Sequence, residues 1–426
     1  MAMSTSAREE WRLGWKLVLA AMLGFSFQSV MMAAIGLFIG PLTQAFAWTR
    51  VQASMGISMA SVAVAVLSPF FGALIDRWGA RRIALPGLAL ASLSFASFSL
   101  ANGSMSQWLA LWAVFTVAML ATKSTVWAAA VSGVFKSALG LALGITMAGA
   151  AVAQIVTPLI TNALIESYGW RVAFAAVGLA WGSIAFVAVA LFLFDARDRR
   201  VRAGIGDAEH AAARLSLPGL SLGEAWRDSS LWKIAISTTL IMMVTIALLV
   251  HQFPLMTEAG IARDHAAVLA SLAGAMGIVG NLLTGWFIDR WRAKWVGGIT
   301  LAVSSLTFLL LLESVRTPVF IALAMVINGY AMGTKLQVCS YLTARHAGTR
   351  NFGAIFGFMA SGISLGAGVG PLIAGMLYDA YGDYTPLLLL GLVVTLFSAG
   401  LILSLGRYPE WGTTQQPASP AGLRAA

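Results

Sequence analysis

Charged residues are scarce in this sequence, and their scarcity argues against a soluble domain. Only 10% of the 426 residues are Asp, Glu, Lys or Arg, whereas these residues make up about a quarter of a soluble domain. The one cysteine, Cys339, excludes an internal disulfide framework. The sequence also lacks His or Cys pairs at metal-ligand spacing and a phosphate-binding loop. We therefore expect no enzyme activity, no metal and no cofactor.

Hydrophobic residues make up 59% of the sequence and form long uncharged blocks, such as 17–39 and 172–194. An α-helix needs about 20 apolar residues to cross a bilayer, and lipid offers no partner for exposed backbone groups. The blocks therefore predict an all-α integral membrane protein with about twelve transmembrane helices. We place these helices near 15–42, 51–75, 83–101, 107–134, 138–164, 171–194, 231–256, 265–288, 296–313, 317–344, 351–378 and 385–406.

The net charge of +10 is explained by where the basic residues lie. If the N-terminus is cytoplasmic, most Lys and Arg residues fall in cytoplasmic segments, as the positive-inside rule requires. On the outer side lie Arg50, Arg171, Arg263 and Arg316. This distribution predicts a multi-pass protein of a cell membrane, the bacterial inner membrane, with both termini in the cytoplasm. It leaves no role for a nucleic-acid partner.

A polar segment, 195–230, divides the chain near its middle. It is rich in Arg, Asp and Glu, which predicts a cytoplasmic linker. We expect an N-terminal six-helix bundle at 1–194, a C-terminal six-helix bundle at 231–406, and a cytoplasmic tail at 407–426.

The two halves of the sequence are similar at one constant shift. GALIDRWGARR at 72–82 and GWFIDRWRAKW at 285–295 share six of eleven residues at a shift of 213. The same shift aligns 158–169 with 371–382, and Gly140, Gly144 and Gly149 with Gly353, Gly357 and Gly362. A constant shift without gaps predicts two halves of parallel topology, related by an axis along the membrane normal.

The loops at 72–82 and 285–294 resemble the signature loop of the major facilitator superfamily and its copy in the second half. The resemblance covers nearly the whole chain, and it is closest to the monocarboxylate and oxalate–formate transporter branch. The features shared with this branch are GLALG at 140–144 followed by Gly149, the triplet Gly169-Trp170-Arg171, and 353–357 leading to Gly370-Pro371. The resemblance implies two pseudo-symmetric six-helix bundles that work as an alternating-access carrier.

Charged side chains of the two loops are candidate gating residues: Asp76, Arg77, Arg81, Asp289 and Arg290. In the family such charges pair across the halves and hold the cytoplasmic side closed, which the resemblance implies here. The alternative is that the basic residues only anchor the loops to the cytoplasmic side. Because anchoring needs no Asp, and the Asp–Arg dipeptide recurs in both loops, we favour the gating role.

Lys123 and Lys335 lie deep inside predicted spans, where a lysine costs about 3 kcal/mol on insertion scales. Shifted by 213, Lys123 falls next to Lys335, so each half contributes a cation at nearly the same level. Every acidic residue falls in a loop, a tail or a helix end, and an anionic substrate between the halves is therefore the most economical partner. The alternative is that the lysines snorkel toward water.

Other polar groups in the spans are candidates for the same site: Trp127, Asn281, Gln28, Gln154 and Asn328. Trp127, one turn from Lys123, is placed to stack on a planar or aromatic substrate. Each such amide alone is more often a hydrogen bond between helices than a ligand. His251 is the candidate proton site, because imidazole titrates near neutral pH; a structural histidine is the alternative.

The sequence departs from the monocarboxylate transporters at their known site. Those proteins have an Asp and an Arg, four residues apart, on the eighth helix and a lysine on the first. The alignment places Gly277 and Asn281 at the pair and Met32 near the lysine. The usual binding cation and proton site are thus missing, which leaves anion exchange and proton-linked transport both open.

These features predict a secondary active transporter of a small organic anion, a mono- or dicarboxylate that includes aromatic acids. We expect it to function as a monomer in the lipid bilayer, with protons or a counter-anion as further partners. A multidrug or solute exporter is the alternative, against which Thr157-Pro158 stands where exporters have Gly-Pro. A non-transporting sensor usually adds a soluble domain, and 195–230 is too short to provide one.

Overall fold

The computed structural model describes residues 7–48, 50–194 and 218–409. In these ranges the chain is helical and has no β-strand, apart from one isolated bridge between Gly219 and Gly348. The expected all-α membrane fold is confirmed. Parts of the expected linker and tail, 195–217 and 410–426, lie outside the described residues.

The helices α1 to α6 form what we call the N-terminal half. They are α1 (Ala7–Phe46), α2 (Arg50–Trp78), α3 (Ala80–Ser97), the 3-10 turn η1 (Phe98–Leu100), α4 (Met105–Ala121), α5 (Ser124–Ser132) and α6 (Leu139–Phe192). The helix α6 has 54 residues and contains one non-helical residue, Gly169, with φ 81° and ψ 166°. A positive φ is strained for residues with a Cβ, so glycine is the residue that fits this reversal. It divides α6 into two segments that are each long enough to cross a bilayer.

The helices α9 to α16 form the C-terminal half. They are α9 (Leu222–Arg227), α10 (Ser229–Glu258), α11 (Arg263–Arg290), α12 (Ala293–Ser304), α13 (Leu306–Leu310), α14 (Pro318–Ala347), α15 (Phe352–Tyr381) and α16 (Thr385–Leu403). The start of α14 shows how the sequence sets a boundary: the Thr317 hydroxyl accepts a hydrogen bond from the Phe320 amide (3.3 Å), and Pro318 follows it. In the described ranges, eleven helices are long and apolar enough to span a membrane. Since α6 is one of them and reverses once, the described residues contain twelve segments of a length that can cross a bilayer.

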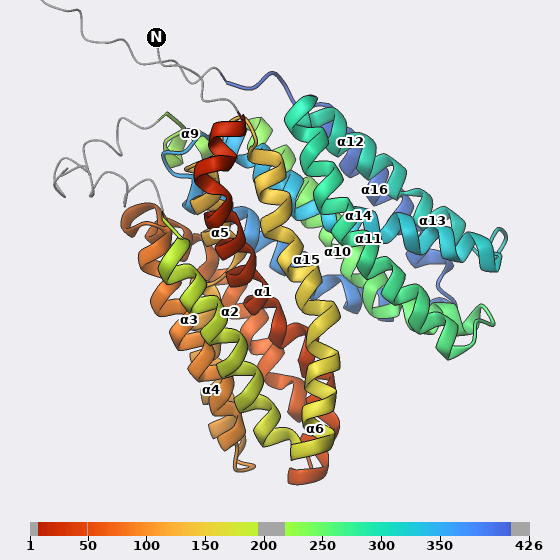
Figure 1. Cartoon of the computed structure of the whole chain (residues 1–426). Helices are drawn as coiled ribbons and strands as arrows, with labels where there is room; N and C mark the ends of the chain where they lie inside the picture. The colour runs from red at the N-terminus through yellow and green to blue at the C-terminus, as the bar shows by residue number, and fades with distance from the viewer. Residues whose placement is uncertain (1–6, 49, 195–217, 410–426) are drawn as a thin grey trace, which may run out of the picture.

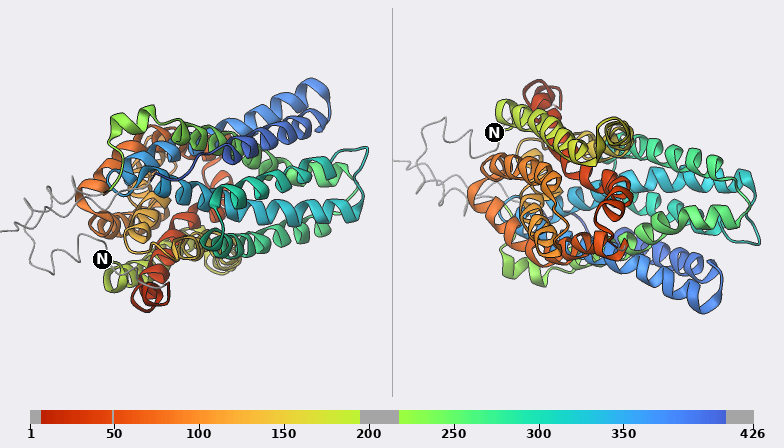
Figure 2. Two further views of the ribbon diagram at one scale, coloured as in Figure 1. Left: turned by 90° about the horizontal axis from the view of Figure 1, so that it is seen from above. Right: turned by 90° about the horizontal axis from the view of Figure 1, so that it is seen from below.

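The two halves meet at one end and diverge toward the other. Figure 1 shows the N-terminal half, in red to yellow, and most of the C-terminal half, in green to blue, joined near the N-terminus of the chain. Seen from above and below in Figure 2, the two groups extend to opposite sides. The joined end carries the C-terminal ends of α2 and α11, and therefore both signature loops.

Within the C-terminal half, α11 and α14 approach so closely that their backbones touch. A Cβ placed on Gly280, Gly329 or Gly333 would overlap a backbone carbonyl oxygen of the other helix. Such small-residue contacts allow dispersion forces to hold helices together in lipid, where the hydrophobic effect between helices is absent.

We predict that Gly333→Ala lowers the apparent melting temperature of the purified protein by several degrees. The added methyl group must push α14 away from α11, and overpacking of this kind costs about 1–3 kcal/mol. The matched control is Gly274→Ala on α11, where a Cβ has open space. Equal melting temperatures of the two variants in a thermal unfolding assay would contradict this account of the helix crossing.

Candidate functional site

Two carboxylates join the halves by capping helices across the junction. Asp76, near the end of α2, accepts hydrogen bonds from the amides of Gly353 (2.7 Å) and Ala354 (2.8 Å) at the start of α15. Asp289, near the end of α11, accepts from the amides of Gly140 (2.6 Å) and Leu141 (2.9 Å) at the start of α6. The first amides of a helix have no partner within it, and they carry partial positive charge. Each half therefore supplies an anion to a helix of the other.

Glycines allow these carboxylates to reach the opposite backbone. A Cβ on Gly72 would overlap the carbonyl oxygen of Gly353, and one on Gly140 would lie 2.6 Å from that of Gly285. The buried side chain of Gln337 adds a further hydrogen bond across the junction, because its Nε2 donates to the Gly140 carbonyl (2.7 Å). At Gly72 and Gly140 the crossing helices thus leave no room for a side chain.

The loop arginines make their described bonds within one half. Arg81 donates from Nη2 to the Ala190 carbonyl of α6 (2.6 Å). Arg290 donates from Nη1 to the Trp286 carbonyl of its own helix (3.2 Å) and stacks on the Trp286 ring at 3.8 Å. Arg77 lies exposed in the last turn of α2. The loop carboxylates, in contrast, bond across the junction to helix starts of the opposite half.

Lys123 lies at a break in the fourth crossing segment, between α4 and α5, and reaches the other half. Its Nζ donates to Ser68 Oγ of α2 (3.1 Å) and to Ser364 Oγ of α15 (2.9 Å). Both partners are neutral hydroxyls, and in the described part of the chain Lys123 makes no ion pair. The half-buried ammonium thus sits at the junction of the halves without a counter-charge.

The break at Lys123 is stabilised by hydrogen bonds that replace those of a continuous helix. The Thr122 hydroxyl lies 3.3 Å from the carbonyls of Ala118 and Met119. The Trp127 indole donates to the Thr122 carbonyl (2.7 Å). The Trp127 ring is fully buried, and a Cβ on Gly24 of α1 would overlap it. Trp127 therefore packs inside the N-terminal half, and its ring is not open to a substrate.

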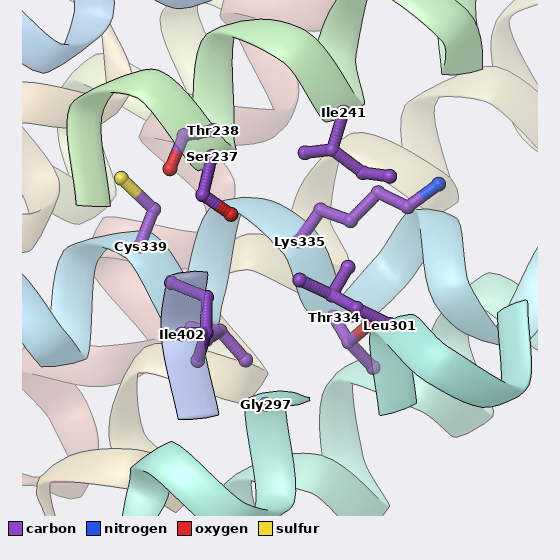
Figure 3. Close-up of a pocket in the computed structure, with 10 residues that line it drawn as sticks. Ser237, Thr238, Ile241, Gly297, Leu301, Thr334, Lys335, Cys339 and Ile402 are labelled. Atoms are coloured by element: carbon purple, nitrogen blue, oxygen red, sulfur yellow. The ribbon is translucent and has the colours of Figure 1, made fainter. Parts of the chain in front are cut away.

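Lys335 lies inside the C-terminal half. Only 6% of it is exposed, and its Nζ donates to Thr245 Oγ1 of α10 (2.6 Å). Its stem lines a cavity of about 20 Å³ between α10, α12, α14 and α16, which has room for roughly one water molecule. Cys339 and Ile402 also line this cavity, and Figure 3 shows the Lys335 amino group pointing away from both of them.

The two lysines therefore do not form the near-symmetric pair that the repeat suggested. Shifted by 213, Lys123 falls on Leu336, and one residue along a helix turns a side chain by about 100°. That rotation is the physical reason why Lys335 does not face the opposite half. Gln337, two residues further on, does contact it.

The four amide residues that the sequence singled out are not gathered into one cluster by any described contact. Asn281 is buried on α11 and donates to its own helix, at the Gly277 carbonyl (3.1 Å). Asn328 is buried on α14, with Met332 sulfur 4.0 Å from its Nδ2. Gln28 is half-buried on α1, and Gln154 is exposed on α6.

His251 belongs to a polar network near the diverging end of the C-terminal half. Its Nδ1 lies 3.1 Å from Tyr384 Oη, and its Nε2 lies 3.4 Å from the Pro371 carbonyl. Tyr378 stacks near Tyr384, with ring centroids 4.6 Å apart, and donates to Glu258 Oε1 (2.8 Å). Burial and the nearby Glu258 carboxylate raise the pKa of Tyr384, which keeps its hydroxyl neutral. Imidazole and exposed carboxylate thus each hydrogen-bond to one of two tyrosines, whose rings are in contact.

Sequence reasoning missed Glu10 and the two serines that hold Lys123. The Glu10 carboxylate is 6% exposed and accepts from the amides of Lys136 (3.1 Å), Ser137 (3.0 Å) and Ala138 (3.0 Å), just before α6. An acidic residue in a basic N-terminal segment was the available signal. Ser68 could have been found through the repeat, since it aligns with Asn281. Nothing in the sequence distinguishes Ser364 from other serines.

The fold and the bonds between halves are those of a two-bundle membrane carrier, and sequence comparison defines its family. Residues 18–262 and 245–425 match the sequence profile of the Major Facilitator Superfamily, and the chain belongs to this superfamily.

Several monocarboxylate transporters are relatives at low identity. Rat monocarboxylate transporter 12 is 24% identical over 61% of this chain and 58% of its own length, so the chain spans less than two thirds of that relative. Human monocarboxylate transporter 11 is 25% identical over 92% of this chain and 81% of its own length. A gallate transporter of Pseudomonas putida is 30% identical over 33% of this chain and 31% of its own length.

Solved structures of the superfamily share the fold. The human organic anion transporter MFSD10 (TETRAN) has a TM-score of 0.70 at 14% identity, covering 92% of this chain and 99% of that one. The fucose:proton symporter FucP of E. coli has a TM-score of 0.70 at 16% identity, covering 91% and 98%. At these identities the likeness concerns the fold alone.

We predict that Asp76→Ala and Asp289→Ala each weaken the joined end by about 1 kcal/mol, the usual cost of a lost helix cap. The measurement is the labelling rate of Ala354→Cys by a hydrophilic maleimide, in a Cys339→Ala background. Labelling should rise several-fold in each variant. The control is Glu166→Gln, an exposed α6 carboxylate that accepts from Asn162 (2.7 Å). An equal rise in the control would refute the capping role.

Proposed function

We propose that this chain is a secondary active transporter of a small monocarboxylate, aromatic acids included, that works by alternating access between its two halves. The observation that carries the proposal is the Lys123 ammonium, which lies at the junction of the halves with two neutral hydroxyls as its partners. The names of the relatives, monocarboxylate and gallate transporters, point to the same substrate class.

The chemistry of the break at Lys123 suits a carboxylate. Lys123 lies between the carbonyl end of α4, which carries partial negative charge, and the amide end of α5, which carries partial positive charge. Discontinuous transmembrane helices in other carriers direct such ends at substrate and ions. A carboxylate bound to Lys123 would neutralise it, and closing the protein around a neutral pair costs less than closing it around a bare charge.

The finer features of the carrier are proposals of the same kind. We propose bundles at 1–194 and 231–406, with Asp76 and Asp289 closing the cytoplasmic side and both termini in the cytoplasm. The distribution of Lys and Arg supports this orientation. We also propose that the protein resides in a bacterial inner membrane and works as a monomer.

For coupling we propose either anion exchange or proton-linked transport, with His251 as the proton site. The support for His251 is its place in a polar cluster: its Nδ1 lies 3.1 Å from Tyr384 Oη, and Tyr378, whose ring contacts that of Tyr384, donates to the exposed Glu258. Imidazole is the side chain whose charge changes near neutral pH.

We predict that Lys123→Met lowers the uptake of benzoate or acetate into proteoliposomes roughly 100-fold, corresponding to about 2.7 kcal/mol of lost interaction with a charged partner. Lys123→Arg, which keeps the positive charge, should retain a measurable part of the uptake.

The matched control is Lys335→Met, because Lys335 also lies inside a predicted span but bonds to Thr245 within one half. It should keep uptake within about threefold of the unchanged protein, a loss below 1 kcal/mol. Normal carboxylate uptake by the Lys123→Met variant would contradict the proposal. Export of cationic dyes by the unchanged protein, with no carboxylate uptake, would favour the exporter instead.

We predict that His251→Gln abolishes benzoate accumulation driven by a proton gradient, while benzoate–benzoate exchange without a gradient continues. The glutamine keeps hydrogen bonding but cannot carry the proton. His265→Gln, at an exposed position on α11, is the control and should accumulate normally. If His251→Gln accumulates as well as this control, His251 is structural and exchange becomes the favoured mode.

A further inference from the structure

The bond from Lys123 to Ser364 differs from the other bonds of this lysine because it crosses between the halves. Lys123 belongs to the N-terminal half and Ser364 to α15 of the C-terminal half, with 2.9 Å between Nζ and Oγ. The second partner, Ser68, lies on α2 of the same half as Lys123, at 3.1 Å. Any motion that separates α15 from α2 at this level must break the bond to Ser364 and can keep the one to Ser68.

Both serines face the ammonium as acceptors. Ser364 donates its own proton to the Ala360 carbonyl (2.9 Å), and Ser68 donates to the Val64 carbonyl (2.6 Å). Each hydroxyl oxygen is therefore left with lone pairs directed at a cation. A hydroxyl is nevertheless a weaker partner for an ammonium than a carboxylate, since ionised acceptors form hydrogen bonds about twice as strong.

We propose that Ser364 is a positioning residue that competes with the substrate for Lys123. Without substrate, its bond to Lys123 helps to hold the halves together. The carboxylate that binds Lys123 displaces Ser364 and so removes one bond that keeps the joined end closed. This inference rests on the proposed function, because it takes the displacing ligand to be a carboxylate.

The competition has two consequences that thermodynamic linkage ties together. Removing the Ser364 hydroxyl must favour the arrangement in which the halves separate at the joined end, even without substrate. It must also raise the affinity for a carboxylate, since binding then no longer breaks a bond. A residue with a purely structural role would not increase affinity when it is removed.

The first consequence is tested by spin–spin distances across the diverging end in lipid nanodiscs. Labels on Ser106→Cys and Ser314→Cys, in a Cys339→Ala background, report this distance, because both serines are exposed and lie in different halves. Without ligand, Ser364→Ala should shift the equilibrium about tenfold toward the shorter distance, which equals 1.4 kcal/mol. Ser364→Thr keeps the hydroxyl and should resemble the unchanged protein.

The second consequence is tested by titrating the same proteins with sodium benzoate and following thermal stability. Ser364→Ala should bind benzoate about tenfold more tightly than the unchanged protein. The matched control is Ser361→Ala, one turn away on α15, whose hydroxyl donates to the Gly357 carbonyl (3.2 Å). It should change neither the distances nor the affinity.

The outcomes separate this inference from the proposed function. A Ser364→Ala variant that behaves like Ser361→Ala in both measurements overturns the inference, whatever the substrate is. A distance shift with unchanged benzoate affinity overturns the competition. A distance shift without binding of benzoate, acetate or succinate to any variant overturns the competition and the proposed function, while the bond between halves keeps its part in closure.

Discussion

Hydrocarbon offers no hydrogen-bond partner, and this constraint accounts for the hydrogen bonds at the break and at two helix starts of the described chain. At the break before α5, the Trp127 indole satisfies the Thr122 carbonyl. At the starts of α6 and α15, the free amides are satisfied by Asp289 and Asp76 of the opposite half. The bonds that complete these two helices are thus the bonds that join the halves. When the halves separate, these amides lose the carboxylates as partners. Water must then reach this end of the protein to supply their hydrogen bonds.

The junction is symmetric, but the interior is not. The two capping carboxylates and the amides they bind are related by the shift of 213 residues that runs through the sequence. Ser68 aligns with Asn281, yet Ser68 accepts from a lysine and Asn281 donates to its own helix. The symmetric junction closes one end of the protein with the same pair of capping bonds from each half. A site for one small molecule, in contrast, needs only one copy of each binding group.

The sequence was sufficient for the fold because the crossing segments are long and the repeat has no gaps. The sequence identified Asp76 and Asp289 as candidates, but not the amides that they bind. Which amides the carboxylates reach depends on how closely two helix ends approach each other. The sequence placed Lys335 opposite Lys123 because a shift of one residue is negligible in sequence. On a helix that shift is about 100° and decides which half the side chain faces. Trp127 was misjudged for a related reason: depth in the membrane can be read from sequence, but the helix facing its ring cannot.

If the substrate binds at the junction, as proposed above, the placement of Lys335 restricts the charge that this substrate can carry. With Lys335 bonded to Thr245 inside one half, Lys123 is the lysine that faces the other half in the described residues. A monocarboxylate would leave the enclosed pair neutral, whereas a dicarboxylate would bring one negative charge in excess. Burying an uncompensated charge costs several kcal/mol, and each transport cycle would bear this cost when the protein closes. One ammonium with hydroxyl neighbours therefore favours substrates with a single carboxylate, and an uncharged aromatic or aliphatic remainder adds no such penalty.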